Sequence, residues 1–170
     1  MTKPPATLRI ALTCADGTLA LMTFVTTEYR ADGSVAWSRL ATRQAVDAEI
    51  ARASVSFDPR HVPVVSWRFI EWSDVPEDRT YRNAWRDRGA GPIEHDMGQA
   101  RELHRVLLRE WRAPQLAELD LAYLRADETN DAPLKEQIAQ QKQRLRDVTA
   151  DPRINAALTI EMLKAIELPA

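Results

Sequence analysis

Apolar and polar residues alternate along the first third of the chain, which is the period of half-buried β-strands. Residues 8–14 alternate strictly, and residues 19–29 and 35–41 are rich in the β-branched and aromatic side chains that strands favour. Asp-Gly pairs at 16–17 and 32–33 separate these runs, and Asp-Gly is a strong hairpin signal because glycine accepts the positive φ of a tight turn. We therefore predict a three-stranded antiparallel meander.

The hydrophobic spacing then changes twice before residue 75. Residues 43–53 have the spacing of a short amphipathic helix, and residues 63–72 are typical of a fourth strand. Trp67 and Trp72 fall on this strand, where we expect them to contact the core. Residues 1–75 are thus predicted to form a small antiparallel β-rich domain with one helix covering a face of the sheet.

Residues 76–96 are predicted to be a connector. Gly89, Gly91 and Pro92 mark the point where the backbone is least constrained by side chains, so we expect the boundary between two units there. Residues 97–170 are predicted to form an α-helical hairpin domain. The fold class predicted for the whole chain is therefore α+β.

The helical part carries its own start and stop signals. Asp96 is expected to cap the first helix, and Pro114 should either kink that helix or make it restart. A polar loop at 129–131 precedes Pro133, which suits the first turn of a second helix. We expect that helix to end at Asp151-Pro152, with a short last helix within residues 157–166.

Three sets of apolar positions are predicted to line the two helices. Their spacings of three and four residues place each set on one face. The first helix has two sets, before and after its proline, and the second helix has one: Leu103, Val106, Leu107 and Trp111; Leu116, Leu119, Tyr123 and Leu124; and Leu134, Ile138, Leu145 and Val148.

Composition adds little that is specific. The 170 residues are 45% hydrophobic and 28% charged, with a net charge of -2, which is ordinary for a globular protein. No basic domain stands out, so nucleic-acid binding is not expected. The segment 79–88 does interleave arginines with Tyr81 and Trp85, as single-strand binders do. A linker anchored by its aromatic side chains and held by salt bridges explains this arginine and aromatic pattern better.

Candidate chemistry is sparse. The single cysteine, Cys14, lies on the apolar side of a predicted strand and reads as a buried free thiol. The three histidines lack zinc-ligand spacing, and no glycine-rich phosphate loop or nucleophile motif occurs. We therefore predict no catalytic residues, no metal and no cofactor. The chain begins without a secretory signal and has no apolar run of membrane-spanning length, so we expect a soluble protein made in the cytosol.

The five tryptophans are the feature most suggestive of partner binding. Tryptophan concentrates both in cores and in interfaces. For Trp85 and Trp111 both interpretations stay open. We take these two, with Tyr81, Arg82 and Tyr123, as the candidate partner-binding residues.

Several short blocks resemble small proteins of tailed bacteriophages and prophages. They are Asp-Arg-Thr-Tyr-Arg-Asn-Ala-Trp at 78–85, Asp-Met at 96–97, Ala-Arg-Glu-Leu-His-Arg at 100–105, Leu-Asp at 119–120, the run from Gln141 to Thr149, Asp-Pro at 151–152 and Leu-Lys-Ala at 163–165. The resemblance covers roughly residues 76–166. The N-terminal sheet lies outside it and looks like a variable module.

The resemblance implies a virion structural or tail-region protein that works by protein–protein contact, with no catalytic residue to carry over. Its expected partners are tail, connector or fibre proteins, bound in several symmetric copies, and its expected location is the virion after synthesis in the host cytoplasm. A tail-fibre assembly chaperone is the alternative, since the helical hairpin is similar to that of such proteins. A small hydrolase acting on the host wall ranks third.

Overall fold

The computed structural model describes residues 5–57 and 62–169 of the chain. The chain folds as two compact units, Met1–Glu94 and His95–Ala170. The first contains an antiparallel sheet and the second is helical, and about 50% of the chain is helix and 22% strand. The predicted α+β class is confirmed.

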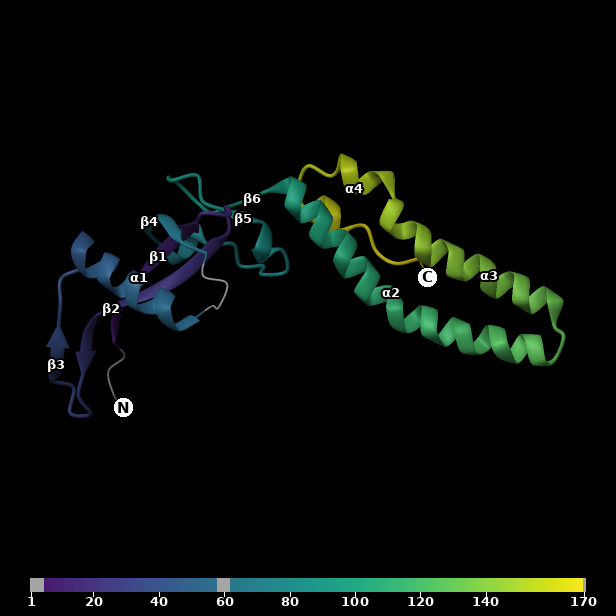
Figure 1. Cartoon of the computed structure of the whole chain (residues 1–170), viewed down its shortest axis with the longest axis horizontal. Helices are drawn as coiled ribbons and strands as arrows, with labels where there is room; N and C mark the ends of the chain where they lie inside the picture. Colours follow the sequence, from purple (N-terminus) through teal and green to yellow (C-terminus); the bar gives the residue numbers. More distant parts are fainter. Residues whose placement is uncertain (1–4, 58–61, 170) are drawn as a thin grey trace. The chain divides into compact units, whose positions relative to one another are not determined.

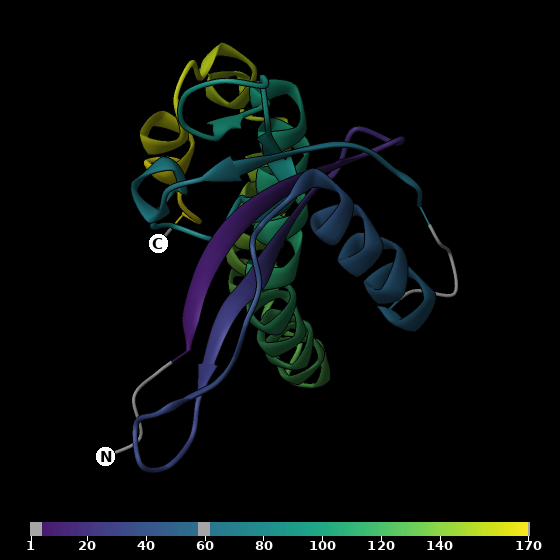
Figure 2. The same cartoon turned by 90° about the vertical axis from the view of Figure 1, so that its left-hand side faces the viewer.

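Unit 1 is built on a four-stranded antiparallel sheet (Figure 2). Its strands are β1 (Ala6–Cys14), β2 (Leu19–Tyr29), β3 (Val35–Ser38) and β4 (Val64–Ile70), in the order β3-β2-β1-β4. The first three form the predicted meander, while β4 returns to pair with β1 on its other side. The strand ends at Ile70, so Trp72 lies beyond it in a short 3-10 turn and is 56% exposed, not in the core as expected.

The two hairpin turns are built alike. Asp16 accepts hydrogen bonds from the backbone N–H and hydroxyl of Thr18, at 2.9 and 2.6 Å. Asp32 does the same with Ser34, at 2.9 and 2.7 Å. The hydroxyl bonds lower the pKa of both carboxyl groups. The glycine between each pair has a φ near +80°, 79° in one turn and 84° in the other, which explains why Asp-Gly predicted both turns correctly.

Helix α1 (Arg43–Phe57) covers one face of this sheet (Figure 2). Val46 of the helix packs with Ile10, Leu12 and Phe24 of the strands, and all four are buried. Thr42 begins the helix, since its hydroxyl accepts the N–H of Ala45 at 3.2 Å.

The opposite face is covered by most of the segment predicted to be a connector. Val75, Trp85 and Ile93 form a buried cluster with Ala11 and Ile70 of the sheet. Two-residue strands β5 (Trp85–Arg86) and β6 (Glu94–His95) pair within this segment. The segment is therefore folded onto unit 1, because its aromatic and aliphatic side chains bury apolar surface that the sheet alone would leave in water.

The glycine-rich stretch expected to be the loosest point is also tied down. The Arg68 guanidinium donates from Nε to both carboxylate oxygens of Asp87, at 2.9 and 3.0 Å, and from Nη2 to the Gly91 carbonyl at 2.6 Å. The Asp87 carboxylate in turn accepts the N–H of Gly89 at 2.9 Å. One arginine of β4 thus anchors the loop to the sheet.

Unit 2 is a helical hairpin followed by two short helices (Figure 1). Helix α2 (Met97–Glu128) and helix α3 (Ala132–Asp147) lie side by side and antiparallel, and α4 (Pro152–Ala156) and α5 (Ile160–Lys164) return to contact α2. Asp96 caps α2 and Asp131 caps α3, through N–H bonds of 3.1 and 3.0 Å. The cap, the polar loop and the helical hairpin are as predicted.

Pro114 lies inside α2 and does not make the helix restart. The proline removes one backbone hydrogen bond, and packing against α3 holds the two halves in one helix. The ribbon of α2 bends along its length (Figure 1), and an internal proline is the usual cause of such a bend.

The buried face of α2 differs from the predicted one. Its buried residues are Ala100, His104, Leu108 and Ala126, whereas Val106, Trp111 and Leu124 are exposed. Two alanines, a histidine and Leu108 take the inward positions, and none of the four was in the predicted sets. On α3 the prediction holds for Ile138, Leu145 and Val148, which are buried, but Leu134 is exposed.

Candidate partner-binding surfaces

Three of the candidate partner-binding residues belong to unit 1, and two of them are interior. Tyr81 is 1% exposed and Trp85 is 4% exposed. Burial also raises the pKa of the Tyr81 hydroxyl. In this fold these two rings offer no surface for a partner or for stacked bases, while Arg82 between them in sequence is exposed. For Trp85 the core interpretation holds.

Trp111 belongs to unit 2 and is 47% exposed. Its ring meets the His104 ring edge to face, with centroids 6.4 Å apart. His104 is fully buried, and its Nε2 lies 3.1 Å from the Ile166 carbonyl oxygen. Burial lowers the pKa of this imidazole, and the carbonyl contact opposes the shift in part. The ring is therefore neutral near pH 7 and donates Nε2–H to the carbonyl.

Tyr123 lies in the seam between the two long helices. The ammonium groups of Lys135 and Lys142 lie 5.7 and 5.3 Å from its ring centroid. Both lysines also pair with acids of α2, Lys135 with Asp127 and Lys142 with Asp120. Tyr123 thus helps to hold the hairpin together and presents only part of its ring to solvent.

Three arginines of α2 hold unit 2 together. Arg101 donates to the Ala157 carbonyl at 2.8 and 3.2 Å, and Arg105 donates to the Asn155 amide oxygen at 2.6 Å. Arg112 binds the Leu145 and Arg146 carbonyls at 3.1 and 2.7 Å, where the end of α3 leaves acceptors unpaired. We missed this role, although arginines at 101, 105 and 112 share one helix face.

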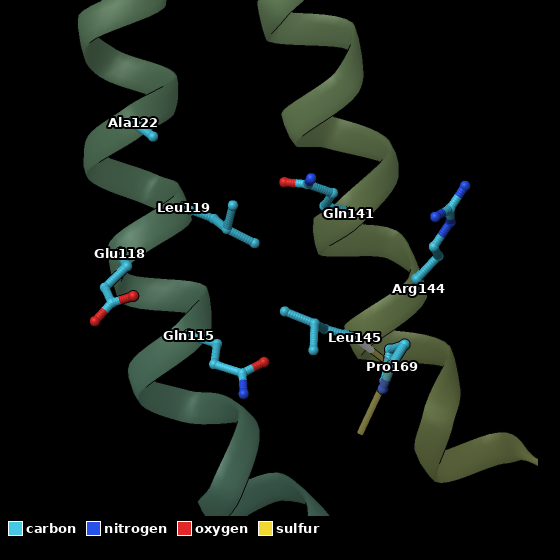
Figure 3. Close-up of a pocket in the computed structure, with 8 residues that line it drawn as sticks. All are labelled: Gln115, Glu118, Leu119, Ala122, Gln141, Arg144, Leu145 and Pro169. Carbon is cyan, nitrogen blue, oxygen red and sulfur yellow. The ribbon is translucent and has the colours of Figure 1, made fainter. Parts of the chain in front are cut away.

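A shallow groove runs between α2 and α3 in the described part of unit 2 (Figure 3). Its cavity volume is about 360 Å³. Leu119 and Leu145 point toward each other across it, Glu118 and Arg144 point away from it, and Pro169 lies beside Leu145. An apolar floor with a polar rim suits an apolar side chain of a protein partner better than a charged small molecule.

A row of exposed apolar side chains lies on the other side of α2. We call it the outer stripe and define it by Val106, Ala113, Ala117, Leu121 and Leu124. All five are exposed, Leu121 and Leu124 by 58% each. At 3.6 residues per turn they share the face opposite Leu108 and Ala126, which is already packed. Sequence reading missed the stripe because it assumed a single apolar face for the helix.

Unit 1 has an apolar patch on β4, which is an edge strand of the sheet. Val65 and Phe69 are exposed on the same side of this strand, and Trp67 between them packs edge to face on Phe69. The Trp67 indole N–H donates to Asp47 of α1 at 2.7 Å. We call Val65, Trp67 and Phe69 the β4 patch.

Within residues 5–57 and 62–169, no group of three or more His, Cys, Asp or Glu side chains could hold a metal ion. Over the same residues, no helix combines the length and apolar character needed to cross a membrane. Cys14 is a free thiol and is partly buried, not fully buried as expected.

Comparison with family models, with curated proteins and with solved structures finds no match to this chain.

Proposed function

We propose that this protein is an assembly component that acts by holding other proteins and has no catalytic role. The observation that carries the proposal is the outer stripe. A 32-residue helix whose inner face is already packed carries a second row of apolar side chains in water. Exposed apolar side chains gathered on one helix face are a candidate interaction site.

The β4 patch gives unit 1 a surface of its own. An outer strand with exposed aromatic and β-branched side chains is suited to pairing with a strand of another chain. In the proposed role, one unit docks onto an assembly and the other holds a neighbouring protein.

We further propose that the assembly is the tail or head–tail connector region of a tailed bacteriophage. The support is the sequence resemblance over residues 76–166. The protein would be made in the host cytoplasm and carried into the virion.

Quantitative mass spectrometry of purified particles tests this role. We expect the protein at a fixed stoichiometry to the major tail protein after density-gradient purification. Its absence from infectious particles would refute a virion role. A purified protein that hydrolyses peptidoglycan, and loses that activity on one polar substitution, would refute a non-catalytic one.

A tail-fibre assembly chaperone is the second candidate, favoured by the groove between α2 and α3. A fibre end could place an apolar side chain between Leu119 and Leu145. Co-expression with the fibre decides: the fibre should be soluble and trimeric with the wild-type protein and insoluble without it. Leu119→Glu should abolish the effect, while Ala139→Glu, at an exposed position of α3, should not. A fibre that is soluble and trimeric when expressed alone rules this candidate out.

A further inference from the structure

Four of the five residues of the outer stripe are placed symmetrically along the helix, and the proposed role does not require this symmetry. Val106, Ala113, Ala117 and Leu124 are separated by seven, four and seven residues, so the spacing reads the same in both directions. Larger side chains stand at the two ends and alanines stand in the middle. The symmetry is centred at residue 115.

We propose that the outer stripe pairs α2 with α2 of a second copy of this chain, in antiparallel orientation about a two-fold axis at residue 115. In a two-fold interface, each residue i that contacts j is matched by a j that contacts i. The antiparallel pair places Val106 against Leu124 of the second copy and Ala113 against its Ala117. The central alanines let the two backbones approach closely, and the larger side chains close both ends.

The charges beside the stripe fit this arrangement. Arg109 and Asp120 lie on the same flank, and both are exposed. An antiparallel two-fold pair brings matching flanks together, so Arg109 lies within one residue of the level of Asp120 of the second copy, twice per dimer, beside the carboxylate that also pairs with Lys142. Glu110 is level with Asp120 of the second copy, but the two carboxylates lie on opposite flanks of the contact. Antiparallel helices also align their dipoles favourably.

The size of the stripe predicts a weak dimer. From 106 to 124 the helix rises about 27 Å at 1.5 Å per residue. A contact of this length buries roughly 400–500 Å² per copy, well below the roughly 800 Å² of a standard stable interface. We therefore expect a concentration-dependent pair, which the high local concentration within an assembly would favour. The dimer itself does not depend on the proposed assembly role, and only its biological purpose rests on that role.

Sedimentation velocity of the purified full-length protein over a wide concentration range is the first test. The wild-type protein should shift from monomer to dimer as concentration rises. Ala117→Glu should weaken the dimer at least ten-fold, because it places two carboxylates at the centre. Ala139→Glu makes the same change on α3, away from the stripe, and should leave the dissociation constant unchanged. Circular dichroism should show both variants folded.

Cysteine cross-linking tests the orientation. In a Cys14→Ser background, Val106→Cys and Leu124→Cys proteins are oxidised separately and as a mixture. An antiparallel pair puts these two positions opposite each other and sets each about 27 Å from its own copy along the helix axis. Only the mixture should then form a disulfide-linked dimer.

Three outcomes would overturn the inference: a monomer at every concentration, equal weakening by both glutamate variants, or cross-linking of each cysteine variant by itself, which indicates a parallel pair. Each is measured on the purified protein. A virion role would fail instead in the particle analysis, so the two failures are distinguishable.

Discussion

Replacing Trp85 with alanine tests whether residues 76–93 belong to the core of unit 1 or only connect two domains. The ring is 4% exposed and packs with Ala11, Ile70, Val75 and Ile93. A buried tryptophan removes roughly 200 Å² from water, which at about 25 cal/mol per Å² is about 5 kcal/mol. Buried Trp→Ala changes cost about 3–5 kcal/mol, so we expect a loss of that size in the free energy of unfolding.

Trp111→Ala is the matched control. This ring is 47% exposed, so the same area argument gives about half as much, ~2.6 kcal/mol. Urea denaturation followed by circular dichroism gives both values, and hydrogen exchange in β1 and β4 reports on unit 1 alone. We expect Trp85→Ala to speed exchange in both strands and Trp111→Ala to leave them unchanged. If Trp85→Ala costs less than about 1 kcal/mol with native exchange in these strands, the core assignment is refuted.

Three further changes probe other features. His104 should make unit 2 less stable as pH falls below about 6.5, because the unfolded chain binds a proton at this imidazole and the buried ring resists one. Thermal melts from pH 7 to 5 should show that the melting temperature depends less on pH in His104→Gln than in the wild-type protein. Equal slopes would contradict this prediction. Arg68→Ala should lower the free energy of unfolding by roughly 3 kcal/mol, because it leaves the Asp87 carboxylate, 5% exposed, without its arginine partner. In urea denaturation, the double variant with Arg68→Ala and Asp87→Ala should recover part of this loss. No recovery would argue against the ion pair. Pro114→Ala should stabilise unit 2 by about 1–3 kcal/mol because it restores a backbone hydrogen bond, and a lower melting temperature would show that the bend is needed for packing.

The elements that could be predicted are those specified by neighbouring residues. Both Asp-Gly turns and the helix cap at Asp96 depend on side chains within two or three positions, and all three are as expected. The hairpin loop at 129–131 is another local feature, ending where Pro133 suits a first turn.

What could not be predicted depends on contacts between distant parts of the chain. His104 points inward, where its ring contacts the Ile166 carbonyl, 62 residues later in the chain. Trp85 is buried because it packs on Ala11 of the sheet. A single-period analysis also assigns each helix one apolar face. Helix α2 has two, so Val106 and Leu124 were assigned to the core although both face solvent.

The position of β1 in the middle of the sheet has a consequence for synthesis on the ribosome. The meander closes through local turns as soon as its strands emerge, but β1 must then wait for β4, more than fifty residues later, before its second edge is paired. Joining ends that far apart is entropically costly and slow, whereas the helical hairpin forms from neighbouring segments. A nascent chain therefore exposes one side of its central strand for several seconds, and that interval is when mispairing with other emerging chains is most probable.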